Sequence, residues 1–157
     1  MRRGLCVAAA LAMAVGLTGT ACSKSDSSST AETTSASTSA SAAAASADKL
    51  PGLVPTPANS QETKGPDSIA DNGIHLHFEV KGSPSDVMNA YRAALQDKGW
   101  AVTTIVSSIG EGGGGATYTG TNGTAYGVFD GGGFNTTTFI NVCAWPAKPA
   151  EPNCTRN

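Results

Sequence analysis

Residues 23–47 are almost entirely serine, alanine and threonine, and this tract limits what the 157-residue chain can fold into. Only Lys24, Asp26 and Glu32 interrupt it. A segment without large apolar side chains cannot offset the entropy that folding removes from its backbone. We therefore expect a disordered tether here, with the folded part of the chain after it.

A second linker is predicted over residues 50–66, because prolines favour extended, polyproline-like backbone. The segment holds Pro51, Pro55, Pro57 and Pro66. Residues 22–68 then form one long linker region, and residues 69–157 form one small domain. A domain of that size is near the lower limit for a self-sufficient hydrophobic core.

The segment before Cys22 has the three parts of a bacterial export signal. Arg2 and Arg3 give a positive start, an apolar run follows as far as Leu17, and small residues stand before the cysteine. The run is shorter than the stretch of about 20 apolar residues that a membrane-spanning helix needs. We expect residues 1–21 to be a signal peptide that is removed.

The residues before Cys22 resemble the lipobox of bacterial lipoproteins, whose cysteine is acylated before the signal is cut. Thr20 and Ala21 fill its two small positions, and Gly19 stands where the family usually has leucine. The resemblance implies that Cys22 carries a lipid. The same residues also fit the small-x-small rule of ordinary signal peptidase, so a free secreted form is the alternative.

The remaining cysteines support lipidation of Cys22. Cys6 would leave with the signal peptide, so Cys22, Cys143 and Cys154 remain, an odd number. In an oxidising compartment we expect a disulfide between Cys143 and Cys154, and closing a loop of this length stabilises a fold by about 3 kcal/mol. Acylation is then the simplest use for Cys22. A metal site at the pair is not expected, because its spacing is not that of a zinc knuckle and no histidine is near it in the sequence.

Residues 74–80 are predicted to form a strand, because apolar and polar side chains alternate with period 2. The apolar positions are Ile74, Leu76, Phe78 and Val80, and the polar positions are His75, His77 and Glu79. A helix is predicted from its N-cap Ser83 to about Lys98, with Gly99 as the left-handed stop. Its apolar stripe is expected at Val87, Ala90, Tyr91, Ala94 and Leu95.

After this helix the sequence predicts strands alone. They are expected over residues 100–107, 116–119, 124–130 and 136–145, with Asn122-Gly123 as a two-residue hairpin turn. The order β-α-β-β-β-β indicates an α+β fold, in which one helix packs on a mostly antiparallel sheet of four to five strands. The first two strands are expected to run parallel.

His75, His77 and Glu79 share one face of the predicted strand, and His-x-His is a usable spacing for metal ligands. A small-ligand or metal carrier that uses this face is therefore one alternative function. A solvated polar face is the simpler interpretation, and no cofactor is predicted.

Two glycine-rich segments match functional loops in sequence pattern but not in structural context. Gly110, Gly112 and Gly115 have the spacing of a dinucleotide-binding loop, but they precede a strand, whereas that loop opens a helix. We expect both this segment and Gly131 to Gly133 to be flexible hairpin loops.

The chain contains no combination of residues that indicates catalysis, and we do not expect an enzyme. Both of its histidines lie on the strand predicted over residues 74–80, and no serine-nucleophile motif is present. The net charge of −2 becomes −4 without Arg2 and Arg3. Because the chain also lacks a basic patch, nucleic acid is not an expected partner.

The layout resembles small actinobacterial cell-envelope lipoproteins of the mycobacterial type, many of which have no assigned activity. The resemblance consists of the Cys22 anchor, the Ser/Thr/Ala-rich stalk, and a compact domain containing the segment Val87–Trp100. It implies a protein that is exported and anchored to the cell membrane, facing the periplasm or the outer envelope. It also implies a non-catalytic module that binds an envelope glycolipid, a polysaccharide or a protein. A purely structural envelope spacer is the alternative.

Aromatic side chains after the helix are the candidate binding groups, because they offer flat surfaces to sugars or apolar ligands. They are Trp100, Tyr118, Tyr126, Phe129, Phe134, Phe139 and Trp145. Most are expected to pack in the core or at its rim. A binding module predicts that the others form a concave or aromatic surface on the sheet face away from the helix.

Overall fold

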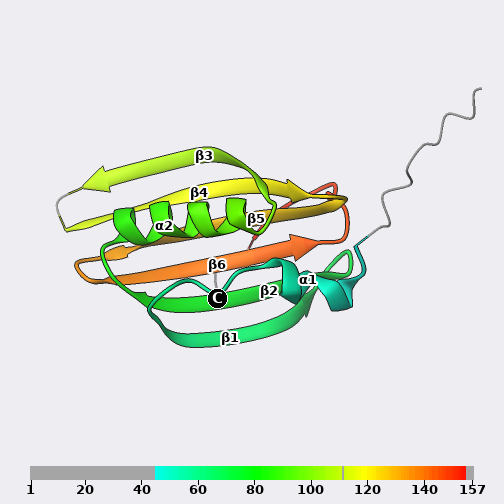
Figure 1. The fold of residues 1–157 in the computed structure, drawn as a ribbon, viewed down its shortest axis with the longest axis horizontal. Helices are drawn as coiled ribbons and strands as arrows, with labels where there is room; N and C mark the ends of the chain where they lie inside the picture. The colour runs from blue at the N-terminus through cyan, green and yellow to red at the C-terminus, as the bar shows by residue number, and fades with distance from the viewer. Residues whose placement is uncertain (1–44, 111, 155–157) are drawn as a thin grey trace, which may run out of the picture. The chain divides into compact units, whose positions relative to one another are not determined.

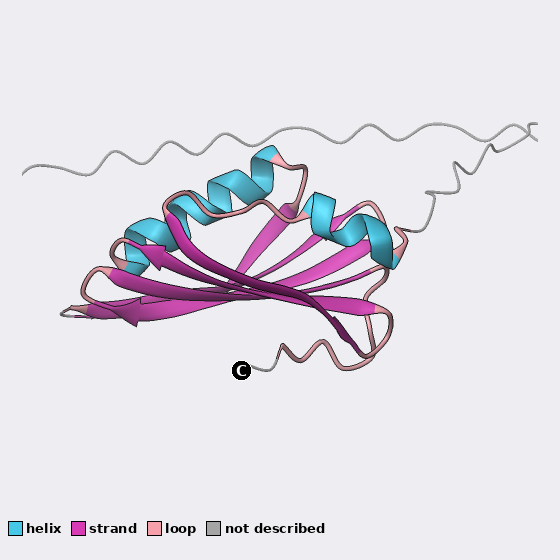
Figure 2. Ribbon diagram, turned by 90° about the horizontal axis from the view of Figure 1, so that it is seen from below, coloured by secondary structure: helices cyan, strands magenta, loops and turns pink. Residues whose placement is uncertain are grey.

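The computed structural model describes residues 45–110 and 112–154. In this part of the chain a six-stranded sheet carries the helices on one face, and the segment after the last strand lies on the other face (Figure 2). The predicted α+β class is confirmed, with six strands in place of four to five. The predicted signal peptide, Cys22 and most of the predicted tether lie outside the described residues.

The strands of the sheet follow one another along the chain with one helix among them (Figure 1). They are β1 (Ser60–Ile69), β2 (Gly73–Lys81), β3 (Ala101–Gly110), β4 (Gly113–Asn122), β5 (Ala125–Phe134) and β6 (Thr137–Trp145). Their order in the sheet is β1-β2-β6-β5-β4-β3, and all neighbours are antiparallel. It follows that β2 and β3, on either side of the helix, run in the same direction as predicted but are not adjacent.

Residues 50–66, predicted to be an extended linker, belong to the fold. A 3-10 helix, η1 (Ala47–Lys49), runs into the short helix α1 (Leu50–Leu53), and β1 begins at Ser60. The linker prediction is therefore wrong from residue 45 onward, and the tether predicted over residues 23–44 lies outside the described residues.

Apolar side chains beside the prolines explain why this segment folds. Leu50 and Val54 are buried in the main core cluster. Trp100 Nε1 donates a hydrogen bond of 2.8 Å to the carbonyl oxygen of Leu53. Pro51 stands in the first turn of α1, where a missing N–H costs no hydrogen bond. Because β1 is an edge strand with mostly exposed side chains, no apolar alternation marks it in the sequence.

Helix α2 (Pro84–Asp97) confirms the predicted helix and both of its ends. The Ser83 hydroxyl accepts a hydrogen bond of 3.4 Å from the Asp86 amide, and Gly99 has a φ of +89°. These are the N-cap and the left-handed stop that the sequence indicates.

The buried side of α2 is turned relative to the predicted stripe. Its buried residues are Pro84, Met88, Tyr91 and Leu95. Val87, Ala90 and Ala94, which the stripe included, lie on the flank of the helix and line a groove. The periodicity therefore identified the helix correctly but misplaced part of its core face.

The main core lies between α2 and the sheet, and aromatic rings fill its centre. The Phe129 ring lies edge-on to two others, with its centroid 6.2 Å from that of Tyr91 and 5.1 Å from that of Trp100. Edge-to-face packing of this kind adds stability beyond the area buried. The Tyr118 hydroxyl donates a 3.2 Å hydrogen bond to the carbonyl oxygen of Met88, which ties α2 to β4.

The glycine-rich segments form strand ends, so the prediction of flexible loops is wrong for most of their residues. β3 ends at Gly110, β4 begins at Gly113, and β5 runs through Gly131 to Gly133. A Cβ on Gly131 would clash with the sulfur of Met88. Glycine at this position therefore lets α2 lie close to β5.

The β4–β5 hairpin turns one residue later than predicted. Asn122 pairs with Ala125, which makes Gly123-Thr124 the turn, and Gly123 has a φ of +60°. The Asn122 side-chain amide donates a 2.9 Å hydrogen bond to the carbonyl oxygen of Lys98. Asn122 thus belongs to the strand and ties the hairpin to the end of α2.

Candidate functional site

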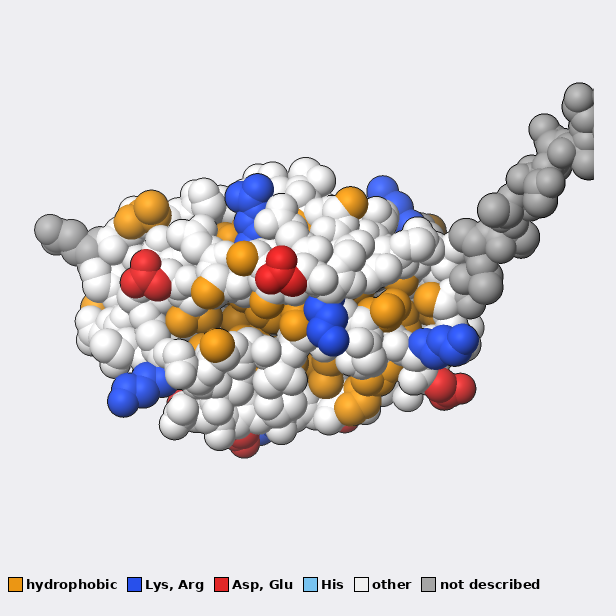
Figure 3. All heavy atoms as spheres, in the orientation of Figure 1, with side chains coloured by type: hydrophobic (Ala, Val, Ile, Leu, Met, Phe, Trp, Pro, Cys, Tyr) orange, Lys and Arg blue, Asp and Glu red, His pale blue; other side chains and the backbone are white. Residues whose placement is uncertain are grey.

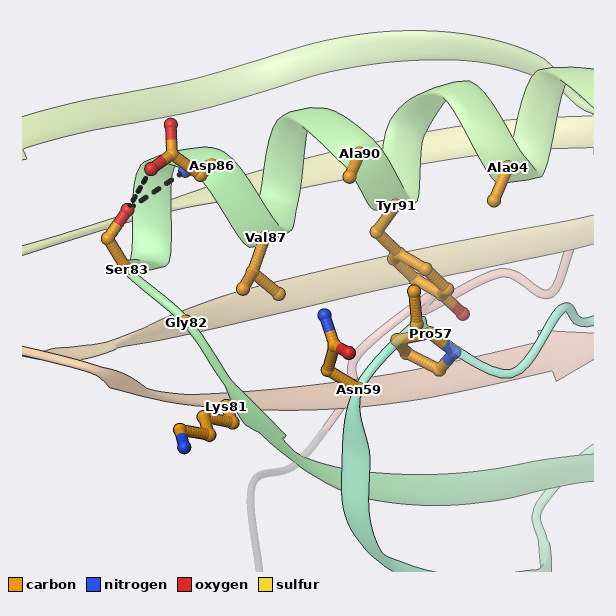
Figure 4. A pocket seen from close by; sticks show the side chains of 11 residues that line it. Pro57, Asn59, Lys81, Gly82, Ser83, Asp86, Val87, Ala90, Tyr91 and Ala94 are labelled. Atoms are coloured by element: carbon orange, nitrogen blue, oxygen red, sulfur yellow. Dashed lines mark hydrogen bonds between the residues drawn. The ribbon is translucent and has the colours of Figure 1, made fainter.

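A groove of 280 Å³ lies beside α2 on the helix-bearing side of the sheet (Figures 3 and 4). One wall is the flank of α2, and the opposite wall is the segment of residues 57–59 that leads into β1. The turn from β2 into α2, at residues 81–83, forms the third side. Figure 3 shows apolar side chains gathered along this face of the molecule. We call this feature the α2 groove.

Small side chains on the helix make room for the α2 groove. Ala90 and Ala94 are one turn apart and share a flank of α2 with Val87, while Pro57 lines the groove from the opposite wall (Figure 4). Gly82 allows the tight turn into the helix, because a Cβ there would lie 2.6 Å from Val87 Cγ2 and its φ is +146°. The walls therefore present mainly carbon atoms to a ligand.

Tyr91 lines the α2 groove, and its hydroxyl oxygen is buried. Its side chain is 1 % exposed, and its ring packs against Phe78 and Phe129. Within the described ranges 45–110 and 112–154, no group forms a hydrogen bond with the Tyr91 hydroxyl. Burial raises the pKa of this hydroxyl, so it stays protonated and is able to donate. A buried hydroxyl without a partner costs about 1–3 kcal/mol, which a ligand that accepts its hydrogen bond would offset.

The charged side chains that line the α2 groove are Lys81 and Asp86, at the end where α2 begins. The Asp86 carboxylate accepts a 2.6 Å hydrogen bond from the Ser83 hydroxyl, so it serves the helix cap (Figure 4). Lys81 is exposed. An anionic group at this end of the groove would therefore meet the Lys81 ammonium beside the Asp86 carboxylate.

The three residues predicted as weak metal candidates do not come together as a ligand set. His75 Nε2 and His77 Nδ1 lie 3.2 and 3.1 Å from the same atom, Asn141 Oδ1. Glu79 lies further along β2, opposite Phe139 of β6. His75 is also buried at 4 % exposure, so the prediction of one solvated face is wrong for this residue.

The predicted disulfide between Cys143 and Cys154 is present, with its Cα atoms 5.5 Å apart. It holds the segment after β6 against the face of the sheet that lacks helices, which we call the outer face (Figure 2). A second, smaller apolar cluster forms there around Val128, Cys143 and Trp145. This covering segment explains why His75, which lies opposite Cys143 in the β2–β6 register, is buried.

The aromatic candidates divide between the two faces of the sheet. Trp100, Tyr118 and Phe129 belong to the main core, and Tyr126 and Trp145 belong to the outer cluster. Phe134 and Phe139, at 64 % and 43 % exposure, remain accessible. Most of the candidates therefore pack as predicted. Concave surfaces are present on both faces: the α2 groove on the helix-bearing side, and a cavity of 400 Å³ on the outer face, the face predicted, which Ile69 and Trp145 help to line.

The residues that build the α2 groove were missed by sequence reasoning. Pro57 to Asn59 were assigned to a linker, and Ala90 and Ala94 were assigned to the core. Two alanines one helical turn apart are a weak signal for a groove. They leave space on one flank of a helix, but a groove forms only where a second segment lies alongside. No sequence pattern places residues 57–59 there.

No family model, curated protein or solved structure matches this chain.

Within residues 45–110 and 112–154, no helix combines the length and the apolar character needed to cross a membrane.

Proposed function

We propose that this protein is an exported lipoprotein, anchored to the cell membrane through Cys22, whose α2 groove binds an acyl chain of an envelope lipid. It acts as a non-catalytic binding module. The observation that carries the proposal is the Tyr91 hydroxyl, which is buried at an apolar groove without a hydrogen-bond partner among the described residues.

The chemistry of the α2 groove favours an amphiphile with a long apolar part. Its walls of alanine, valine and proline offer dispersion contacts and few polar ones. A sugar ring needs several hydrogen-bonding groups, whereas an acyl ester or carboxyl group needs one donor, which Tyr91 supplies. Lys81 suits an anionic headgroup at the open end.

The remainder of the chain fits a protein that works at a membrane. The Cys22 segment resembles a lipobox, and acylation of a cysteine together with a second acyl group gives stable anchoring. A lipid anchor would keep the α2 groove in the same compartment as envelope lipids. This supports a lipid as the ligand in preference to a soluble metabolite.

Blocking the α2 groove tests the proposal. The probe is a fluorescent long-chain fatty acid, with a diacyl phospholipid as the competitor. Ala90→Trp fills the groove, and we expect it to weaken binding at least about tenfold, equivalent to 1.4 kcal/mol. Ala93→Trp is the matched control, because Ala93 is exposed on the same helix and does not line the groove.

Comparison of the two variants distinguishes binding in the α2 groove from general adsorption to the protein surface. Ala93→Trp should bind as the unmodified chain does. If Ala90→Trp also binds unchanged, the acyl chain does not enter the α2 groove and the proposal fails.

Lipidation is tested separately, by metabolic labelling with an acyl precursor in a host that processes lipoproteins. The unmodified chain should take up the label and Cys22→Ser should not. Equal labelling of the two forms would show that the anchor is elsewhere.

A further inference from the structure

A second site is built around the disulfide on the outer face of the sheet. One ligand atom from each of His75, Cys143 and Cys154 lies within 4.8 Å of the others. His75 and Cys143 are directly opposite each other on β2 and β6, and the disulfide brings Cys154 to them. The histidine that the sequence places far from the cysteines is therefore beside them in space.

This donor set matches the ligands of zinc. Two cysteine thiolates and one imidazole bind Zn²⁺ in tetrahedral sites, and three protein ligands leave a fourth position open. The sulfur atoms are bonded to each other in the structure, so the set becomes available only when the disulfide is reduced.

Asn141 already orients the imidazole for such a role. Its side-chain oxygen Oδ1 lies 3.2 Å from His75 Nε2, and because an amide oxygen can only accept, this contact requires the Nε2–H tautomer. The Nδ1 lone pair is then the one available to a metal. Metal-bound histidines commonly donate their other ring N–H to an oxygen in this way, which fixes both tautomer and orientation.

The surroundings also leave space for a fourth ligand. A cavity of 400 Å³ is lined by His75 and Cys143 and also by Asp71 and Glu151. Water in this cavity would complete four-coordination. Cys154 lies outside the sheet, so its sulfur is able to move away from Cys143 without breaking a strand pairing.

We infer that reduction of the Cys143–Cys154 disulfide converts this cluster into a binding site for a divalent zinc-type metal ion. A small-molecule thiol supplies the electrons: two thiol molecules become one disulfide, and Cys143 and Cys154 each gain one hydrogen. Metal binding then releases one proton from each cysteine thiol, and the neutral imidazole of His75 binds through its lone pair. The site is on the opposite face of the sheet from the α2 groove and is independent of the proposed lipid binding.

Cobalt binding tests this inference, because Co²⁺ substitutes for zinc and absorbs light when thiolates bind it. The full chain is used with Cys6→Ser and Cys22→Ser, so that Cys143 and Cys154 are its only cysteines. After reduction with a dithiol and its anaerobic removal, we expect one equivalent of Co²⁺ to produce a thiolate-to-cobalt charge-transfer band. The oxidised chain should show none. Absence of the band from the reduced chain would overturn the inference.

Matched histidine variants show whether His75 is a ligand. His75→Ala should weaken Co²⁺ binding at least about tenfold and change the visible spectrum, and Asn141→Ala should weaken it by about 10–100-fold. His77→Ala is the control and should bind as the parent does, because His77 is not part of the cluster. Equal affinity and spectrum in His75→Ala and the parent would overturn the site.

Folding is followed by circular dichroism in the same reduced samples. If reduction unfolds the chain, Co²⁺ should restore the folded spectrum in the parent and not in His75→Ala. Failure of Co²⁺ to restore the parent would also contradict the inference.

Discussion

The two faces of the sheet are held together by different means. On the helix-bearing face, α2 packs through Met88, Tyr91 and Leu95 against a continuous apolar core. On the outer face, a short covering segment is held by one disulfide over a small cluster around Val128 and Trp145. Packing alone suffices where a whole helix covers the sheet, whereas the outer face uses a covalent bond where little apolar area is available.

The faces also differ in how their polar groups are satisfied. On the outer face Asn141 contacts two histidines, and the Thr117 hydroxyl donates a 2.6 Å hydrogen bond to Asp130. On the helix-bearing face the Tyr118 hydroxyl has a partner, but the Tyr91 hydroxyl has none among the described residues. The Tyr91 hydroxyl, on the helix-bearing face, is therefore our candidate donor to a ligand.

The largest expected difference in stability between the two faces is that between Phe129→Ala and Phe139→Ala. Phe129→Ala removes a fully buried ring from the main core and should lower the free energy of unfolding by about 3–5 kcal/mol. Phe139→Ala removes a half-exposed ring from the outer face and should change it by about 0.5 kcal/mol or less. Chemical denaturation measures both. Similar losses in the two variants would show that the outer face carries as much of the stability as the main core.

Removing the disulfide is expected to have the next largest effect. The double substitution Cys143→Ser and Cys154→Ser opens the loop and should lower the free energy of unfolding by about 3 kcal/mol. Hydrogen exchange should then show lost protection on β2 and β6 near His75, with the amides of α2 little changed. A loss of protection spread equally over α2 would contradict the separation of the two faces.

Two buried tyrosines of the core, Tyr91 on α2 and Tyr118 on β4, should change the free energy of unfolding with opposite signs. Tyr91→Phe removes a hydroxyl that has no partner in the described part of the chain, so the ligand-free protein should gain about 1 kcal/mol. Tyr118→Phe breaks the hydrogen bond to Met88 and should lose about 1 kcal/mol. Thermal unfolding gives the sign of each.

The same two variants test whether the Tyr91 hydroxyl contributes to binding in the α2 groove. Tyr91→Phe should bind the fatty-acid probe about 2–10-fold more weakly, since one hydrogen bond is worth about 0.5–1.5 kcal/mol. Tyr118→Phe should bind it unchanged. A stabilised Tyr91→Phe that keeps full affinity would mean that the hydroxyl faces no ligand.

Features marked by local sequence were predictable, and features made by long-range pairing were not. Ser83 and Gly99 define the ends of α2, and alternation over residues 74–80 defines β2. The exposed edge strand β1 carries no such pattern. The contact of His75 with the disulfide depends on the register of β2 against β6, which no local motif records. For the same reason the sequence grouped His75 with His77 and Glu79 and gave no sign that His75 lies beside Cys143 and Cys154.

The central claim is that Tyr91 donates its hydrogen bond to an acyl ligand in the α2 groove. The chain has three tyrosines, so ¹³C labelling of the tyrosine Cζ carbons gives one reporter in the groove and two outside it. In a titration with a long-chain fatty acid, we expect the Tyr91 resonance to move to saturation while those of Tyr118 and Tyr126 stay in place. A fatty acid that binds to saturation without moving the Tyr91 resonance would contradict the claim.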